Sequence, residues 1–572
     1  MTDAASLGAI LLPRETVGYI RPWPNVQLLQ IESARSLGGC SILDARGVYA
    51  KSPEWKWELG TRSVAQRCSL PSRRLRTDDI DLRARRARAG HPVSAAPVRF
   101  GTAEGRWVIA AAVLGSGIAF LDSTVVNVAL PAIRADLHLS VAGLQWTVDA
   151  YLVTLSALLL FGGSLGDVVG LRRVFVAGLV GFVVASLLCG LAPSAGALIA
   201  ARGLQGAAAA FLVPGSLAIV STTFHSDDRI RAVGAWSGLA GVASAIGPLL
   251  GGWLIDAVSW RLIFLINLPL AAIAAWIALR HVPDTRLDGV RRPDIAGAVA
   301  VTVGLAGVTY ALIEGPGGGA LVVMLGLLGV VALVAFVVIE SRVRDPMLPL
   351  TLFRSKQFNG ANLTTFAVYA GLGGALFFVV LQLQLTLRYS AIQAGASLLP
   401  VTVLMLAFSS RVGALAQRIG PRIPMTVGPI VAAVGLALLG RVQPGSHYLT
   451  TVLPAVVVFG AGVTVTVAPL TAAVLAAVDE GHLGAGSGAN NAVARVAGLV
   501  AVATLPTLAG IESRSVDTLA DGYATAMRIC AGVCGLGGLI AWTTIRERAK
   551  MSPVPHPSLM QSCQHPYSTQ AD

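Results

Sequence analysis

Residues 163–173 read Gly163-Ser164-Leu165-Gly166-Asp167-Val168-Val169-Gly170-Leu171-Arg172-Arg173. Long apolar segments flank this stretch, residues 146–162 before it and residues 174–191 after it. A helix needs about 20 apolar residues to cross a bilayer, so both segments are close to membrane-spanning length. A short loop with one carboxylate, three glycines and an arginine pair is therefore predicted to lie here at a membrane face.

A weaker copy of this stretch occurs in the second half of the chain. Residues 413–422 read Gly413-Ala414-Leu415-Ala416-Gln417-Arg418-Ile419-Gly420-Pro421-Arg422. Two glycines, a leucine and an arginine recur at the same spacing, whereas Gln417 stands at the position of Asp167. An internal repeat of this kind indicates two halves with one architecture, as in transporters that rock one half against the other.

The composition of the 572-residue chain is that of a membrane protein. Apolar residues make up 54%, charged residues only 13%, and the mean hydropathy is +0.70. A soluble chain has roughly 25% charged residues, so this one cannot face water on all sides. The net charge of +13 is accordingly assigned to loops and tail rather than to nucleic-acid binding. The six cysteines show no metal-ligand spacing, and no metal or cofactor is expected.

Fourteen membrane-spanning helices are predicted from Trp107 onward, which makes the fold an all-α polytopic one. Two of them, 295–313 and 319–340, are almost purely Val, Leu, Gly and Ala and are interpreted as a linker pair facing lipid. The predicted divisions are a leader at 1–105, a first six-helix bundle at 106–281, the linker at 282–345, a second six-helix bundle at 346–545 and a tail at 546–572.

The leader differs in kind from the rest of the chain. It carries arginine-rich runs at 73–76 and 83–88, has no long apolar segment, and lacks the pattern of a signal peptide. Basic segments of low apolar content rarely fold, so a disordered leader is predicted. The alternative is a basic arm that touches anionic lipid headgroups.

Lysine and arginine concentrate in every second loop between the predicted spans, which sets the orientation. One set of loops includes Arg172, Arg173, Arg291 and Arg292, and the tail continues that set, whereas the alternate loops hold scattered arginines such as Arg261. Cytoplasmic loops carry such an excess of positive charge. We therefore expect a multi-pass plasma-membrane protein with both termini in the cytoplasm.

Three ionisable side chains fall inside predicted spans. Asp122 lies in the first span, Asp149 in the second and Arg202 in the fourth. Counting at 1.5 Å per residue places each about 9–12 Å from the same membrane face, so they can share one cavity. Charged groups at such depth are functional candidates, and this set could take up and release a proton. The alternative is that each pairs structurally or reaches the interface.

Several motifs resemble one known family when taken together. Residues 163–173 are similar to the loop between helices 2 and 3 of the major facilitator superfamily. Its fourteen-helix drug:proton antiporters, of the EmrB/QacA type, have further motifs that this chain resembles in helices 1, 4, 5, 6 and 13, at Leu121–Pro131, Arg202–Gly206, Gly247–Gly252, Trp260–Pro269 and Gly486–Arg495. Ala243 stands where the helix-5 motif usually has another glycine. The resemblance covers the chain from about Trp107 to Ile545.

That resemblance implies a major facilitator fold and a role for each motif. The first is proton coupling and transport, by Asp122, Asp149 and Arg202. The second is a conformational latch, comprising Gly163, Leu165, Asp167, Gly170, Arg172 and Arg173. The third is an antiporter motif, comprising Gly234, Gly247, Pro248, Gly251 and Gly252. A candidate substrate cavity comprises Asn127, Trp146, Tyr151, Asn491 and Arg495.

Each of these motifs also has a purely structural interpretation. The Gly247-Pro248 pair could be a packing kink rather than a hinge face that blocks leakage. Residues 163–173 could form a plain turn. Asn490, Asn491 and Arg495 could line a cavity or simply form hydrogen bonds between helices.

The function predicted is proton-coupled export of drug-like or amphiphilic compounds, by a protein that is not an enzyme. A phosphate-binding loop of the G-x-x-x-x-G-K-[ST] type is absent from the sequence, so direct ATP drive is not expected. The expected partners are the lipid bilayer, a small amphiphilic substrate and protons, with no nucleic acid, and the protein is expected to be a monomer. Alternatives are a metabolite, siderophore or lipid exporter, a lipid-modifying membrane enzyme, or an uncoupled channel.

The charge of the cargo depends on what the two aspartates do. If Asp122 and Asp149 face the solute, with Trp146 and Tyr151 close by, a lipophilic cation is favoured. If both acids serve protons, neutral or anionic lipophiles become the better cargo. The first interpretation predicts broad amphiphiles, cations included.

Overall fold

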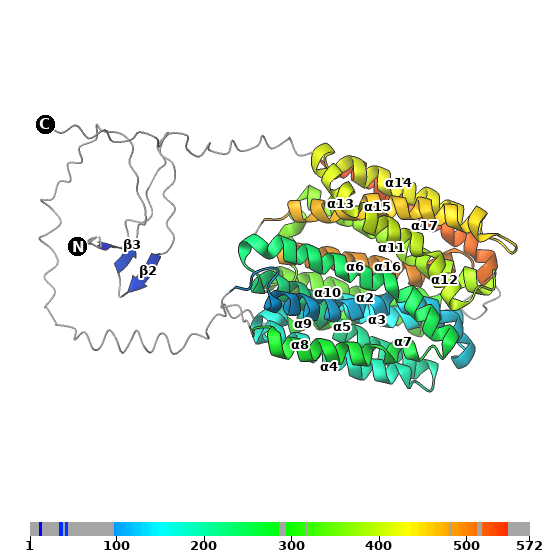
Figure 1. Cartoon of the computed structure of the whole chain (residues 1–572), viewed down its shortest axis with the longest axis horizontal. Coiled ribbons are helices and arrows are strands. Elements are labelled where there is room, and N and C mark those ends of the chain that lie inside the picture. Colours follow the sequence, from blue (N-terminus) through cyan, green and yellow to red (C-terminus); the bar gives the residue numbers. More distant parts are fainter. Residues whose placement is uncertain are drawn as a thin grey trace, which may run out of the picture. The chain divides into compact units, whose positions relative to one another are not determined.

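The computed structural model in Figure 1 describes residues 97–284, 293–315, 319–479, 483–511 and 518–546, and three short strands near the N-terminus. The strands are β1 (Leu11–Pro13), β2 (Ala34–Leu37) and β3 (Cys40–Leu43), paired antiparallel in the order β1-β3-β2. They belong to a separate unit, Met1–Pro92. The rest of that unit and the tail from residue 547 lie outside the described residues, so the predicted disorder of the leader stays a prediction.

The second unit, Val93–Asp572, holds fourteen helices in its described part that are long and apolar enough to cross a membrane, which confirms the predicted number. The first six spans are α2 (Ala103–Leu137), α3 (Val141–Val169), α4 (Leu171–Gly190), α5 (Ala195–Thr223), α6 (Ser226–Ala257) and the broken span α7–α8 (Leu262–Leu265 and Asn267–His281).

Two linker helices follow, α9 (Ile295–Glu314) and α10 (Gly319–Arg342). A 3₁₀ turn, η3 (Leu350–Arg354), leads into the last six spans. These are α11 (Lys356–Leu385), α12–α13 (Ala391–Ser397 and Leu399–Ile419), α14 (Arg422–Leu439), α15 (Leu453–Ala476, preceded by the π-helical turn η4, Tyr448–Val452), α16 (Leu483–Leu508) and α17 (Thr518–Thr544).

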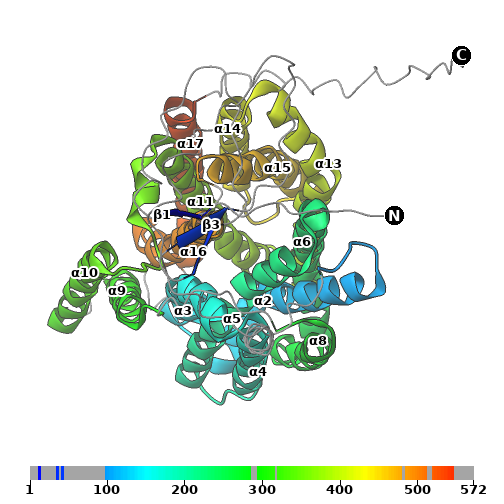
Figure 2. The same ribbon diagram turned by 90° about the vertical axis from the view of Figure 1, so that its left-hand side faces the viewer.

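Two bundles and a flanking pair of helices are visible when the molecule is viewed end-on. Figure 2 shows α2 to α8 together on one side, α11 to α17 on the other, and α9 with α10 outside both. Helix α9 packs against α3 and α16, one helix from each bundle. In the most apolar segment of α10, only 11% of the residues are buried inside the protein, as expected for a helix that presents its side chains to lipid.

The stretch predicted as a loop at 163–173 is almost entirely helical, which corrects that prediction. Helix α3 continues to Val169 and α4 begins at Leu171, so only Gly170 separates them. Gly170 has φ +118°, and its counterpart Gly420 between α13 and α14 has φ +84°. Glycine reaches these dihedral angles at little cost, which allows a reversal of direction at a single residue.

The sequence repeat is also a structural repeat. Arg172 donates from Nη1 to the carbonyl oxygen of Val282 at the end of α8, at 3.1 Å. Arg422 donates from Nε to the carbonyl oxygen of Trp542 near the end of α17, at 2.9 Å. Each arginine therefore ties the second hairpin of its bundle to the last helix of that bundle. We call the membrane face with Gly170 and Gly420 the arginine-rich face, and the other the opposite face.

The membrane unit begins before residue 105. Val98 forms a parallel bridge with Phe224, and Arg99 pairs with Asp227 and Asp228 at the start of α6. Phe100 donates its backbone N–H to Asp228 at 3.1 Å. These contacts attach residues 98–100, which the sequence analysis placed in the leader, to the α5–α6 connection of the membrane unit.

Candidate functional site

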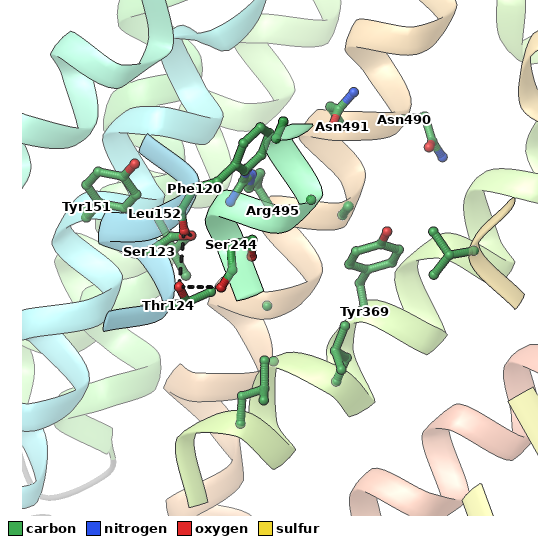
Figure 3. Close-up of a pocket in the computed structure, with 18 of the residues that line it drawn as sticks. Phe120, Ser123, Thr124, Tyr151, Leu152, Ser244, Tyr369, Asn490, Asn491 and Arg495 are labelled. Atoms are coloured by element: carbon green, nitrogen blue, oxygen red, sulfur yellow. Dashed lines mark hydrogen bonds between the residues drawn. The ribbon is translucent and has the colours of Figure 1, made fainter. Parts of the chain in front are cut away.

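A cavity of about 500 Å³ lies between the two bundles. Its wall is built by α2, α3, α5 and α6 from the first bundle and by α11, α15 and α16 from the second. Figure 3 shows Phe120, Ser123, Thr124 and Ser244 on one side, with Tyr369 across from them. On α6, α15 and α16 the lining residues fall in 236–244, 467–475 and 487–502, mainly in the halves nearer the arginine-rich face.

The cavity wall is mostly apolar, with rings and a few polar groups. The aromatic residues are Phe120, Tyr151, Trp236 and Tyr369. Thr124 Oγ1 donates to the carbonyl oxygen of Ser244 at 3.1 Å, which joins α2 to α6. A wall of this kind suits an amphiphilic organic molecule with a ring system.

The predicted cavity residues are only partly brought together. Asn127, Tyr151, Asn491 and Arg495 line the cavity. Trp146 is not among its lining residues and instead packs against Tyr310 of α9, with ring centroids 6.1 Å apart.

For the neighbouring Asn490, the sequence left two roles open, lining the cavity or forming hydrogen bonds between helices. The structure shows both. Asn490 lines the cavity, while its Nδ2 donates to Thr365 Oγ1 at 2.7 Å and to Asn362 Oδ1 at 3.1 Å. These bonds tie α16 to α11 within the second bundle.

A buried ion pair lies at the cavity wall, with its arginine in the lining and its aspartate behind it. Arg202 Nη1 lies 2.5 Å from Asp122 Oδ2, and both side chains are almost fully buried. Arg202 lines the cavity, whereas Asp122 does not. The Arg202 guanidinium also lies over the Tyr151 ring, 4.4 Å from its centroid, and its Nε donates to the carbonyl oxygen of Thr147 at 3.1 Å.

Two amides complete the coordination of Asp122. Gln205 Nε2 donates to Asp122 Oδ1 at 2.9 Å and Asn267 Nδ2 donates to the same oxygen at 3.3 Å. Gln205 Oε1 in turn accepts from Arg202 at 2.6 Å. The pair is therefore part of a network over α2, α4, α5 and α8, in which Ser186 of α4 accepts from both amides. Sequence reasoning missed Gln205 and Asn267 as members, although both stand in motifs that it had singled out.

Asp149 lies apart from this network. It is fully buried, and neither of its carboxyl oxygens has a hydrogen-bond partner. Gln145, one turn earlier on α3, donates to the carbonyl oxygens of Val502 and Ala503 on α16 at 2.8 and 3.1 Å. That face of α3 therefore points toward the second bundle, and Asp149 is not among the lining residues of the cavity. Of the three predicted charges, the structure brings Asp122 and Arg202 together and leaves Asp149 outside their network.

The arginine pair of the predicted latch contacts its own bundle. Arg173 Nε lies 3.0 Å from Asp284 Oδ2 and Arg172 Nη2 lies 3.8 Å from the same oxygen, just after α8. Asp167 lies half-buried in the last turn of α3, and Gly163 and Leu165 precede it by four and two residues on the same helix. These contacts fasten α8 to the α3–α4 reversal.

The glycines of the predicted antiporter motif face two different helices. A Cβ on Gly247 or Gly251 would collide with Thr124 or Val125 of α2, so these glycines allow α6 to lie close against α2. A Cβ on Gly252 would lie 2.5 Å from the Cα of Ile392 in α12. A Cβ on Gly395 of α12 would likewise collide with the backbone carbonyl group of Pro248. Gly234, by contrast, has open space around it, so the structure gives no packing role to that position.

The α6–α12 contact closes the opposite face between the bundles. Asp256, near the end of α6, accepts from the first two backbone N–H groups of α12, those of Ala391 at 3.1 Å and Ile392 at 2.9 Å. A carboxylate at a helix N-terminus satisfies orphan donors and interacts favourably with the helix dipole. Gln384 of α11 adds a bond across the bundles, to the carbonyl oxygen of Val128, at 2.9 Å.

Comparison with known protein families identifies the family to which this fold belongs. The family model described as Major Facilitator Superfamily matches residues 112–502. The chain belongs to the Major Facilitator Superfamily. Members of this superfamily are transporters rather than enzymes, which confirms both the predicted fold and the prediction that the chain is no enzyme.

Curated relatives within the superfamily are resistance and export proteins. The chain is 35% identical to the puromycin resistance protein pur8 of Streptomyces alboniger over 80% of this chain and 96% of that protein. It is 37% identical to the cephamycin export protein CmcT of Amycolatopsis lactamdurans over 71% of this chain and 85% of that protein.

Solved structures show the same fold. A POT family transporter in complex with 5-aminolevulinic acid superposes with a TM-score of 0.60, at 14% identity, over 77% of this chain and 96% of that one. At this identity the likeness extends to the fold alone.

Proposed function

We propose that this protein is a proton-coupled antiporter that exports drug-like or amphiphilic compounds across the plasma membrane. The observation that carries the proposal is the Asp122–Arg202 pair, buried at the wall of a mostly apolar cavity. The relatives are named for antibiotic resistance and antibiotic export, which supports the choice of cargo.

The orientation follows from the charge of the loops. Because positive charge concentrates in cytoplasmic loops, the arginine-rich face is assigned to the cytoplasm, together with both termini. The cavity walls are then nearest the cytoplasm, and the α6–α12 closure lies on the outside. This arrangement corresponds to the inward-facing half of a transport cycle, in which cargo enters from the cytoplasm.

Coupling can act through the charge that the cavity wall presents. With Asp122 ionised, its charge offsets that of Arg202, and the cavity side of the pair is nearly neutral. When Asp122 takes up a proton, the offset is lost, and the buried Arg202 is destabilised until the bundles rearrange. Proton uptake and a change in the cargo site are thereby linked through one contact, as antiport requires.

The test is transport by the purified full chain in proteoliposomes. A pH gradient of the correct sign should drive a fluorescent amphiphile against its concentration gradient, and a protonophore should collapse that accumulation. Cargo movement that continues unchanged after the protonophore is added would refute proton coupling while leaving export intact.

The latch prediction concerns the reversal at Gly170. Asp167→Asn is expected to slow turnover several-fold with less than a twofold change in cargo affinity, because the residue lies far from the cavity wall and biases the conformational equilibrium. Transport rate and binding are measured on the same preparation. Gln417 stands at the repeat position, so Gln417→Asn serves as the control and should leave both quantities unchanged. A variant with weakened binding and normal turnover would contradict the latch.

The leader is predicted to be dispensable. Deletion of residues 2–95 should leave expression and transport within a few-fold of the full chain, because the contacts of Val98, Arg99 and Phe100 with the α5–α6 connection are retained. Membrane fractionation and the proteoliposome assay provide the measurement. A matched deletion of 2–101 removes those contacts and should lower the yield, and failure of the shorter deletion to insert would show that the leader is required.

A further inference from the structure

Among the described residues, the cavity carries one positive charge that no ion pair offsets. Among its described lining residues the only formally charged side chains are Arg202 and Arg495. None of those lining residues is an aspartate or glutamate. Arg202 is neutralised by Asp122 behind the wall, but the described residues contain no ion pair to Arg495.

Arg495 lines the cavity, and its guanidinium contacts a ring but has no ion-pair partner among the described residues. It lies on α16, half-buried, and its guanidinium carbon is 5.5 Å from the centroid of the Phe120 ring (Figure 3). Within the described part of the chain, none of its side-chain N–H groups donates a hydrogen bond. A guanidinium has five such donors in a fixed fork that matches a carboxylate or sulfonate.

Flat apolar surface surrounds this unpaired cation. Phe120 lies under the guanidinium, and Tyr151 and Tyr369 line the same cavity. Asn491, one turn before Arg495, adds a polar side chain on the same helix. The groups offered together are therefore one cation, several ring faces and an amide.

We infer that the cargo is an amphiphilic organic anion, an aromatic body bearing a carboxylate, sulfonate or phenolate, and that Arg495 is its anchoring residue. This inference rests on the proposed export function and specifies its cargo. It replaces the prediction of a cationic cargo. That prediction depended partly on Asp149 and Trp146, and neither residue lines the cavity. A cation would instead meet Arg495, whose charge has no ion-pair partner among the described residues, and like charges repel strongly in a low-dielectric cavity.

Two dyes that differ by one anionic group test the inference. These are 8-anilinonaphthalene-1-sulfonate and N-phenyl-1-naphthylamine, which share a ring skeleton and differ in the sulfonate. Binding is measured by equilibrium dialysis against the full chain in nanodiscs of zwitterionic lipid, with empty nanodiscs as the blank. No proton gradient is used, so failure of proton coupling cannot mimic failure of the anion site.

The wild type should bind the sulfonate more tightly than the neutral dye. Arg495→Gln should weaken sulfonate binding about ten- to hundred-fold, the usual value of a hydrogen bond to a charged group, and change neutral-dye binding less than twofold. Arg495→Lys keeps the charge and should retain most of the affinity. Arg528→Gln makes the same chemical change at an exposed position on α17 and should have no effect.

Three outcomes would overturn the inference. One is a wild type that does not prefer the sulfonate, and another is an Arg495→Gln variant that binds the sulfonate normally. The third is an Arg495→Gln variant that loses affinity for both dyes to the same extent, together with an Arg495→Lys variant that shows the same loss. That result would assign Arg495 to a partner inside the protein in another conformation, such as Asp149, whose face of α3 points toward α16.

Discussion

Asp122→Asn is expected to abolish gradient-driven export, lowering uphill transport at least a hundred-fold, while exchange of cargo down its gradient continues. The asparagine keeps the shape of the side chain and can still accept from Gln205 and Asn267, but it cannot release or take up a proton. Uphill accumulation and cargo exchange are measured in the same proteoliposomes. Undiminished uphill transport by the variant would remove Asp122 from the coupling mechanism.

A matched double variant separates coupling from stability. The single change leaves Arg202 buried without a counter-charge, and breaking a buried ion pair typically costs about 3–5 kcal/mol. Asp122→Asn combined with Arg202→Gln removes both charges and is expected to recover much of the lost thermal stability. It should remain uncoupled. A double variant that regains gradient-driven export would show that the pair is needed for folding alone.

Gly252→Val is expected to reduce turnover by at least fifty-fold by preventing closure of the opposite face. A Cβ at this position would press on the backbone of Ala391 and Ile392, and backbone cannot move aside as a flexible side chain can. The face would then stay open, and the two-state cycle would be held in one state. Spin labels at the exposed Val258 and Gln393 should report a longer distance across the contact than in the wild type.

Gly238→Val provides the control for this variant. Gly238 lies on the same helix but has no atom within 4 Å of where a Cβ would be. The same substitution there should leave turnover and the spin-label distance nearly unchanged, because only the small helix-propensity difference remains. Equal loss in both variants would show that α6 itself was damaged. A closed distance in inactive Gly252→Val would reject the closure mechanism.

The sequence predicted the fold because membrane helices are set by local composition. Runs of about 20 apolar residues identify spans without knowledge of tertiary contacts, so the number of helices and the linker pair were found. The ends were less accurate. Helix α2 continues past Pro131 to Leu137, and α3 extends through Asp167 to Val169, because helices project beyond the hydrocarbon core into the interface.

The rotation of each helix could not be predicted from one sequence. Trp146 and Asp149 are three residues apart and share a face of α3, whereas Tyr151 points elsewhere. The first face packs against α9 and α16, and Tyr151 lies by Arg202 at the cavity. An even distribution of apolar residues around a membrane helix gives no signal for which face meets which neighbour.

Partners distant in sequence were likewise beyond prediction. Asn267 reaches Asp122 from α8, Asp284 meets the arginine pair from beyond α8, and Asp256 caps α12 in the other bundle. Each is an ordinary polar residue near a helix end or in a known motif. Only the tertiary arrangement shows which of them approach a charge or an unpaired backbone group.

The α6–α12 closure has a consequence for how such a protein can change over generations. Its contacts are made by glycines, a proline, backbone groups and one carboxylate, and Gly252, Asp256 and Gly395 are all absent from the cavity lining. Substitutions at the cavity wall can therefore alter which compounds are accepted without disturbing the seal that prevents leakage. Selection by a new toxin can act on the wall residues of α2, α11 and α16 while the barrier to ions is inherited intact.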